Sequence, residues 1–261
     1  MRSLNIGATG MLAQQLNVEV ISHNIANMNT TAFQRRRVEF QDLLYQNIRR
    51  VGSDSSDAGT IVPAGVQIGL GVKTAAVYRI TEQGNLSLTE NTLDLAINGE
   101  GYFEVQLPDG ETGYTRSGAF QLSQNGEIVT VDGFTVLPGL TIPDGAIDVT
   151  VNPSGEVLVQ LDGQVAPQNI GQLNLATFSN EAGLLAVGDN LYLETPASGG
   201  ATVGNPDTAG FGRLQQGFLE TSNVNVVEEI TNLITAQRAY EMNSKVIETS
   251  DQMMATMSNV R

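Results

Sequence analysis

The 261-residue chain contains no cysteine, no tryptophan and a single histidine, His23. Without cysteine it cannot form a disulfide, a thiolate zinc site or a thiol nucleophile, and a histidine-dependent triad has one candidate only. Aromatic residues make up 5% of the chain, so the sequence gives little support to a surface that stacks bases or sugars. The composition therefore argues against several common classes of enzyme and binding protein.

Long hydrophobic runs are missing as well. No stretch approaches the roughly 20 apolar residues that span a bilayer. Near the N-terminus, Asn5, Thr9 and Gln14 interrupt any apolar run, and Arg2 alone makes a poor basic region, so we expect no cleavable signal peptide. We therefore expect a protein that stays in the cytoplasm or is exported by a route that reads no such signal.

Positive charge is scarce outside the two ends of the chain. The net charge is −15, and residues 51–210 carry three basic side chains against nineteen acidic ones. Residues 1–50 carry six arginines against three acids, and residues 211–261 carry four basic against six acidic side chains. An acidic surface repels phosphates and anionic lipid, so we expect neither nucleic-acid binding nor direct membrane insertion. The simplest interpretation of the acidic middle is a solvated face.

The two ends of the chain share a pattern that its middle lacks. Apolar residues recur every seventh position from residue 4 to about 28 and again from 224 to 257, which predicts two helices that pair like a coiled coil. These stripe residues are candidates for self-assembly: Leu4, Met11, Val18, Ile25, Val226, Leu233, Tyr240, Ile247 and Met254. A chain with such ends favours an assembly architecture over an active site.

The first helix is weakened by Gly7 and Gly10, each of which costs about 1 kcal/mol relative to alanine. We therefore expect the ends to be mobile in the monomer and to become helical when neighbouring copies cover their other faces. The alternative is an ordinary pair of helices packed on a core within one chain. Ser222, Asn223 or Asn225 could cap the second helix.

The middle of the chain carries turn-forming dipeptides between short apolar or alternating runs, a pattern typical of antiparallel strands. They are Asn98-Gly99, Asp109-Gly110, Asn125-Gly126, Asp132-Gly133, Asp144-Gly145 and Asp162-Gly163. The predicted fold is α+β, with the terminal helices as a coiled-coil-like inner layer and a mainly antiparallel β middle domain, a barrel or a sandwich.

The domain boundaries follow from this division. We expect residues 1–45 and 216–261 to form the terminal-helix assembly domain and residues 76–215 the outer β-domain. Residues 40–45 fit either a helical turn or a strand. Residues 52–71, rich in Gly, Ser and Asp, predict a flexible excursion or an extended hairpin, so residues 46–75 form a separate extended segment.

No constellation of side chains predicts catalysis. Glu100 and Glu104 would face the same solvated side of a strand, and the Gly69-Leu70-Gly71 run lacks the third glycine of a dinucleotide site. Asp109, Asp132 and Asp207 stand singly in turns, without the spacing of a calcium loop, and His23 has no second metal-binding neighbour. We expect no catalytic residues, no cofactor and no metal.

Motifs at both ends and in the middle of the chain resemble those of the rod and hook family of bacterial flagellar axial proteins. Matching stretches include Ser22–Phe33, Gly99–Phe103, Tyr114–Gly118 and Gly217–Asn225, with Ala32 where that family often has glycine. The motif residues are Asn24, Asn27, Thr30, Phe33, Ser222, Asn223, Asn225, Gln237, Arg238 and Tyr240. The resemblance covers essentially the whole chain.

The resemblance implies a structural subunit that polymerises into a hollow helical tube and is not an enzyme. In its length and in the Asp42–Gly71 segment, the chain is most similar to distal rod members of the family. The resemblance implies that residues 46–75 make extra contacts that stiffen the rod, and that the rod transmits motor torque to the hook. Implied partners are further copies of the chain, proximal rod and hook proteins, the proteins of the peptidoglycan and outer-membrane rings, and the type III export apparatus. Implied location is the periplasm-spanning rod of the basal body.

Two rival functions remain open at this stage. The first is a hook or proximal rod subunit, which would differ in curvature or length rather than in chemistry. The second is a peptidoglycan hydrolase, because a shaft that crosses the cell wall needs an opening, and its support is limited to Glu100 and Glu104.

Overall fold

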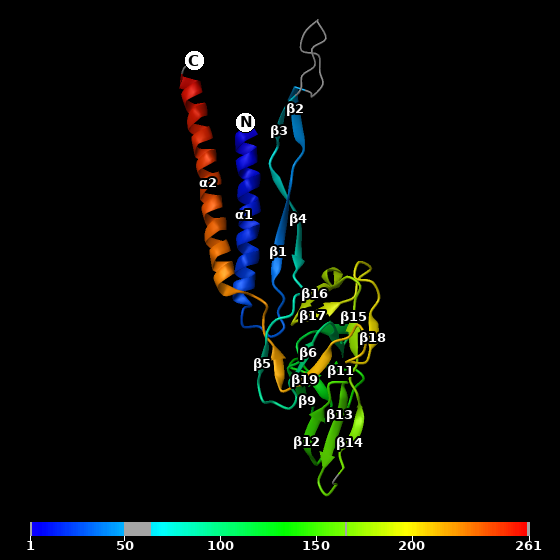
Figure 1. Cartoon of the computed structure of the whole chain (residues 1–261). Helices are drawn as coiled ribbons and strands as arrows, with labels where there is room; N and C mark the ends of the chain where they lie inside the picture. The colour runs from blue at the N-terminus through cyan, green and yellow to red at the C-terminus, as the bar shows by residue number, and fades with distance from the viewer. Residues whose placement is uncertain (1, 50–63, 165, 260–261) are drawn as a thin grey trace. The chain divides into compact units, whose positions relative to one another are not determined.

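The computed structural model describes residues 2–49, 64–164 and 166–259, and these residues form two compact units (Figure 1). Unit 1 comprises Met1–Ala26, Arg36–Arg79 and Asn225–Arg261. Unit 2 comprises Asn27–Arg35 and Ile80–Val224. Both helices belong to unit 1, and all but four of the described strands belong to unit 2. The predicted α+β class, with paired terminal helices and a mainly antiparallel β middle, is confirmed.

Unit 1 contains two helices and four described strands. Their bounds are α1 (Arg2–Ala26), β1 (Arg36–Asp42), β2 (Tyr45–Arg49), β3 (Val66–Gly69), β4 (Val72–Arg79) and α2 (Val226–Asn259). The helices lie side by side and antiparallel, so that the two chain ends lie at the same end of the helix pair (Figure 1).

The start of α2 follows from a polar side chain that caps it. The side-chain Oδ1 of Asn225 accepts hydrogen bonds from the backbone N–H groups of Val227 (3.2 Å) and Glu228 (3.4 Å). Capping satisfies donors that have no partner inside the helix, and the carboxylates of Glu228 and Glu229 in the first turn complement the helix dipole. Of the three candidate caps, Asn225 is therefore the one that caps α2, which begins two residues later than predicted.

Strands β1 and β4 form an antiparallel ribbon that β2 and β3 continue. The ribbon is continuous between the two pairs because the Leu43 N–H donates to the Gly71 carbonyl (2.9 Å) and the Leu70 N–H donates to the Leu44 carbonyl (3.2 Å). Residues 40–45 thus comprise the end of β1, a two-residue link and the start of β2, and they do not form a helical turn. Residues 50–63, the central part of the predicted flexible excursion, lie outside the described residues.

Helix α1 lies between α2 and this ribbon. The amide of Asn24, 1% exposed, donates to the Arg36 carbonyl and accepts from the Arg36 N–H, both at 2.8 Å. Farther along α1, the Thr9 hydroxyl accepts from the Val72 N–H at 3.4 Å. Gly71 packs so closely against Thr9 that an added Cβ would overlap the Thr9 hydroxyl, and its φ of +125° also favours glycine.

Unit 2 is built from short antiparallel strands in several sheets. The largest has nine strands, in the order β16-β17-β8-β7-β11-β10-β9, with β15 paired to β7 and β18 paired to β15; a three-stranded sheet has the order β12-β13-β14. Two further pairs are β19–β6 and β20–β5.

The strands of unit 2 are short, with two to six residues each. Their bounds are β5 (Leu86–Leu88), β6 (Leu95–Asn98), β7 (Tyr102–Gln106), β8 (Thr112–Thr115), β9 (Phe120–Leu122), β10 (Ile128–Thr130), β11 (Thr135–Val136), β12 (Ala146–Val151), β13 (Glu156–Leu161), β14 (Gln168–Gln172), β15 (Leu175–Thr177), β16 (Leu185–Gly188), β17 (Leu191–Leu193), β18 (Thr202–Gly204), β19 (Arg213–Gln216) and β20 (Phe218–Glu220), with one 3-10 turn at Glu181–Gly183.

The described strands do not close into a barrel, so that option of the prediction is wrong. Closure requires the first and last strands of the sheet to pair. In unit 2 the end strands β9 and β16 do not pair with each other, and β7 carries three neighbours, which branches the sheet. The tight turns favour pairing between consecutive strands, and they place no constraint on the long-range pair that would close a barrel.

Two hydrophobic clusters stabilise unit 2. The larger one joins the nine-stranded and three-stranded sheets around fully buried side chains such as Ile97, Phe103 and Val157. The smaller one is aromatic: the Tyr102 ring packs edge-on against Phe178 and Tyr192, with ring centroids 5.9 Å apart in both pairs. Edge-to-face aromatic pairs add stability beyond the area they bury.

Candidate self-assembly surface

Most of the predicted stripe residues of the two helices are partly shielded from solvent. Leu4, Met11, Val18 and Ile25 of α1 are all half-buried. Four stripe residues of α2 are half-buried as well: Val226, Leu233, Ile247 and Met254. Tyr240 differs from the other eight because its side chain is 43% exposed. Eight of the nine predicted residues are thus half-buried on the two helices, and the ninth is exposed.

The most buried positions of the α2 contact face escaped the sequence prediction. Glu229, Ala236 and Ser250 are buried, and Asn243 is half-buried. These four residues also recur every seventh position, three residues after the apolar stripe, which is the second contact position of a heptad. Because only one of them is apolar, hydrophobic periodicity could not identify them. The seven-residue spacing itself was the available signal.

Small residues allow the two helices to approach closely. An added Cβ on Gly7 would lie 2.9 Å from Cγ1 of Ile247, and one on Gly10 would lie 2.9 Å from Nδ2 of Asn243. Both distances are shorter than real Cβ contacts, so a side chain at either position would displace its neighbour on α2. The two glycines that weaken the isolated helix are therefore the residues that let the pair form.

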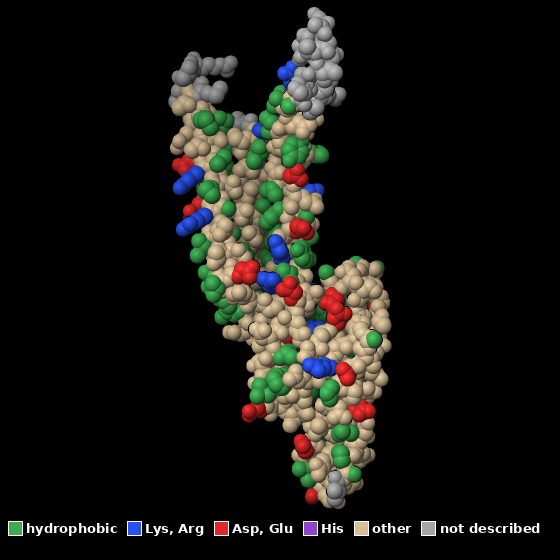
Figure 2. Space-filling view, in the orientation of Figure 1, with side chains coloured by type: hydrophobic (Ala, Val, Ile, Leu, Met, Phe, Trp, Pro, Cys, Tyr) green, Lys and Arg blue, Asp and Glu red, His purple; other side chains and the backbone are tan. Residues whose placement is uncertain are grey.

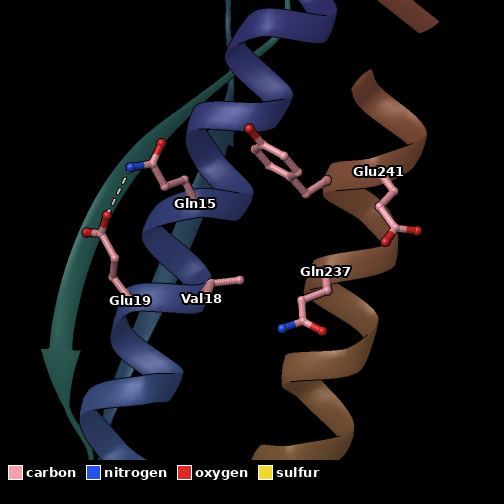
Figure 3. A pocket seen from close by; sticks show the side chains of 6 residues that line it. Gln15, Val18, Glu19, Gln237 and Glu241 are labelled. Atoms are coloured by element: carbon pink, nitrogen blue, oxygen red, sulfur yellow. Dashed lines mark hydrogen bonds between the residues drawn. The ribbon is translucent and has the colours of Figure 1, made fainter. Parts of the chain in front are cut away.

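A groove of about 480 Å³ opens between the helices. It is lined by Gln15, Val18 and Glu19 of α1 and by Gln237, Tyr240 and Glu241 of α2. Figure 3 shows Val18 and Gln237 pointing into the space between the helices, whereas Glu241 points away from α1. The Gln15 amide donates to the Glu19 carboxylate at 3.1 Å along the same helix. The lining residues of the groove do not form a convergent set of catalytic groups.

The outer face of α2 exposes large apolar side chains. Val227 is 75% exposed and Met242 is 63% exposed, and four more residues of α2 are exposed to a similar degree: Ile230, Ile234, Val246 and Met253. Figure 2 shows hydrophobic side chains along this edge next to neighbouring basic and acidic ones. A helix that is apolar on more than one face is normally covered on each of them.

The N-terminal motif residues have structural roles in the described part of the chain. Asn24 fixes the start of β1, as shown above. The Thr30 N–H donates to the Asn27 carbonyl and the Thr30 hydroxyl donates to the Asn27 side-chain oxygen, both at 3.2 Å, which forms the turn after α1. Phe33 is half-buried in unit 2, and Ala32 has a left-handed φ of 55°. The glycine that the family often has at this position would adopt this angle without strain.

The C-terminal motif residues divide between the two units. Asn225 caps α2, and Gln237, Arg238 and Tyr240 are exposed on α2. Asn223 makes hydrogen bonds through both ends of its side-chain amide, and the neighbouring Ser222 accepts from the Val224 N–H at 3.4 Å.

Two further motif residues form a buried ion pair that the sequence did not reveal. The Arg116 Nε donates to the Glu220 carboxylate at 2.7 Å, and the two side chains are 5% and 3% exposed. Arg116 follows β8 and Glu220 ends β20, which are 104 positions apart in the chain. No local pattern links residues so distant, so the pairing needs the tertiary structure.

The candidate catalytic residues do not form an active site in the described structure. Glu100 lies exposed before β7 and not on the strand, so the expectation that Glu100 and Glu104 share one face of a strand is wrong. Burial raises the pKa of Glu104, and Glu104 lies opposite Tyr114 across the β7–β8 ladder. The pKa of Tyr114 is raised by burial and then by the charges of Glu104 and Glu194.

His23 is exposed on α1, and its pKa is lowered by partial burial and then by the positive charge of Arg36. The described part of the chain contains no cluster of three or more His, Cys, Asp or Glu side chains suited to a metal ion. Among the described helices, none is long and apolar enough to cross a bilayer.

Three family models match this chain, and together they cover more than half of it. Residues 4–34 match "Flagella basal body rod protein", residues 96–159 match "Flagellar hook protein FlgE/F/G D1 domain", and residues 215–260 match "Flagellar basal body rod FlgEFG protein C-terminal". The first match covers most of α1 and the turn that follows it. The third match runs from within β19 through α2, and the second falls within unit 2.

Full-length relatives agree with these matches. The chain is 61% identical to flagellar basal-body rod protein FlgG of Caulobacter vibrioides over 100% of both chains. It is 52% identical to the protein of the same name from Agrobacterium fabrum, over 99% of this chain and 98% of the relative. The corresponding protein of Bacillus subtilis is 40% identical over 100% of this chain and 99% of the relative. The chain therefore belongs to the flagellar basal-body rod protein family.

Proposed function

We propose that this chain is the subunit of the distal rod of the bacterial flagellum, which polymerises into a rigid hollow tube and transmits motor torque to the hook. The observation that carries the proposal is the full-length identity of 61% to a basal-body rod protein, joined to a helix pair with an apolar outer face. In this role the chain is a structural protein and not an enzyme.

Self-association uses the surfaces of α1 and α2 that a single chain leaves open. The stripe residues hold α1 against α2, and the outer apolar side chains of α2, such as Ile230 and Ile234, pack against neighbouring copies. Burial of an apolar side chain contributes about 1.5–3 kcal/mol, so a few contacts repeated at every subunit stabilise a polymer. The ends of the chain are less ordered before assembly than after it.

The remaining partners follow from the position of a distal rod. The proximal rod and hook proteins bind its two ends, and the peptidoglycan-ring and outer-membrane-ring proteins surround it in the periplasm. The acidic region, residues 51–210, faces these rings. The subunit reaches this place through the flagellar export apparatus.

A hook or proximal rod subunit is the second candidate, because the family model for residues 96–159 is described as a flagellar hook protein domain. The hook differs from the rod in curvature. Assembled tubes therefore distinguish the two candidates by their shape.

Electron microscopy of the concentrated, full-length protein tests the proposal. We expect straight hollow tubes from the wild type and none from Ile234→Asp, because Ile234 is 47% exposed and a carboxylate there would be buried in the polymer. Asn232→Asp is the matched control, since it adds the same charge at an exposed position of α2 and should still assemble. Curved tubes would favour the hook, and a wild type that stays monomeric when seeded with purified rods would refute the proposal.

A further inference from the structure

The chain passes between unit 1 and unit 2 four times: after Ala26, Arg35, Arg79 and Val224. Every one of these connections begins or ends in one of three segments of unit 2, namely residues 27–35, 80–85 and 220–224. Any torque that the helices pass along the backbone to unit 2 therefore enters through these segments. How firmly they are held together decides how stiff the connection is.

The side chain of Asn223 joins all three segments. Its Oδ1 accepts from the Arg35 N–H at 2.7 Å, and its Nδ2 donates to the carbonyls of Ile80 (3.0 Å) and Glu82 (2.9 Å). Its backbone N–H donates to the Phe33 carbonyl at 3.3 Å. The acceptor and both donors of the amide are thus used, each on a backbone group of a segment far away in sequence.

Backbone pairs extend the same junction on both sides of Asn223. The Ile80 N–H donates to the Arg35 carbonyl at 2.9 Å, which pairs the second segment with the first. The Thr221 N–H and hydroxyl both donate to the Asn85 carbonyl, at 2.8 and 2.9 Å, which pairs the third segment with the second. These pairs flank the side-chain amide of Asn223.

The chemistry of the site requires an amide. A carboxylate has the same shape, but it would place an oxygen against the two carbonyls that Nδ2 now contacts, and two acceptors repel each other. A nearby ion pair, Arg35–Glu82 at 3.4 Å, offers little replacement because Glu82 is 73% exposed and surface pairs contribute little.

We propose that Asn223 is a positioning residue that locks the three connecting segments of unit 2 into one junction, so that the connections to the helices are stiff. The role of this junction in torque transmission rests on the proposed function. The junction itself is a property of the single chain. Without the amide the segments would open locally while the hydrophobic clusters of unit 2 stay folded.

Hydrogen–deuterium exchange on the unassembled full-length chain tests this inference. In Asn223→Asp we expect exchange in residues 30–35, 80–85 and 220–224 to rise about tenfold to a hundredfold, which is the effect of losing one or two hydrogen bonds. Exchange in β7 should not change. Asn225→Asp is the matched control: it makes the same substitution two residues away, and aspartate caps a helix as well as asparagine, so exchange in the three segments should stay as in the wild type.

A pH series adds a readout that loss of packing would not produce. A protonated carboxyl group can donate one hydrogen bond, so the difference in melting temperature between Asn223→Asp and the wild type should shrink as the pH falls from 7 to about 4, near the ordinary pKa of aspartate. Asn223→Ala has no group to protonate, and its difference should stay constant over the same range.

Two outcomes would overturn the inference. One is unchanged exchange in the three segments of both Asn223 variants. The other is loss of protection in β7 to the same extent in both variants, which would make Asn223 a residue of overall stability. Neither depends on polymerisation, so a wild type that forms no tubes would refute the proposed function and leave this result standing.

Discussion

The buried ion pair of Arg116 and Glu220 offers the sharpest prediction of stability. Besides the 2.7 Å bond between them, Arg116 donates to the carbonyls of Gly101 (2.9 Å) and Gly99 (2.7 Å), and Glu220 accepts from the Gly84 N–H (2.9 Å). Arg116→Met keeps most of the side-chain volume but removes the charge and all three donated bonds. It leaves a buried carboxylate without its counter-charge.

Breaking a buried pair by removing one partner typically costs about 3–5 kcal/mol, because the remaining charge is not solvated. We therefore expect Arg116→Met to lower the free energy of unfolding of unit 2 by about 4 kcal/mol, and Glu220→Gln by about 3 kcal/mol. In the double variant no unpaired charge remains, while the glutamine can still accept from the Gly84 N–H. Its cost should fall short of the sum of the two single costs by about 2 kcal/mol.

Urea unfolding of the full-length variants, followed by near-ultraviolet circular dichroism, measures these energies. The signal reports on unit 2 because its aromatic cluster contains Tyr102, Tyr114 and Tyr192 and the chain has no tryptophan. In thermal unfolding, Arg116→Met should lower the melting temperature by about 10 °C. Arg213→Met, which removes an exposed arginine of β19, is the control and should change stability by less than about 0.5 kcal/mol. A cost below about 1 kcal/mol for Arg116→Met, or full additivity in the double variant, would refute the reasoning.

Three further predictions concern other parts of the chain. Gly10→Leu should abolish tube formation in the electron microscope without changing the unfolding of unit 2, because a Cβ there would lie 2.9 Å from Asn243 and force the helices apart; tubes of normal appearance would contradict this. Asn225→Ala should cost about 1 kcal/mol of α2 stability, measured by helical ellipticity on heating, while Asn225→Asp should cost nothing, and equal losses would argue against capping. Burial raises the pKa of Glu104 above its ordinary value of 4.5, so the folded state binds the proton more tightly than the unfolded one. The contribution of Glu104 to stability is therefore fully present below that value and is lost as the pH rises through the raised pKa. Glu104→Gln should remove this pH-dependent contribution, as measured by urea unfolding from pH 4 to 8.

Turn chemistry was readable from the sequence, but strand pairing was only partly so. All six predicted turn dipeptides place their glycine at positive φ. Four of them connect strands that pair with each other, for example Asp109-Gly110 between β7 and β8. Asn98-Gly99 and Asp144-Gly145 also turn the chain, but the strands on either side pair elsewhere: β6 pairs with β19 and β12 pairs with β13. A turn is a local property, whereas the partner of a strand depends on the burial of distant residues.

The sequence also predicted which part of each helix faces the other helix, because apolar side chains at seven-residue spacing share one face. It could not identify the polar residues on the same face, such as Asn243, or the second contact face of α1 that carries Asn24. The ribbon covers that second face through hydrogen bonds to the backbone of Arg36, and these leave no hydrophobic pattern in the sequence.

The sequence by itself determined the fold class, the two terminal helices, the tight turns and the family, because periodicity, turn propensity and motif identity are local properties of the chain. The tertiary structure decided the long-range strand pairs, such as β6 with β19, the buried ion pair of Arg116 and Glu220, and the junction around Asn223. The ion pair joins residues 104 positions apart, and the junction joins three separate segments of the chain. Their energies depend on which polar groups lose water together, and that is fixed only when the segments have packed against one another.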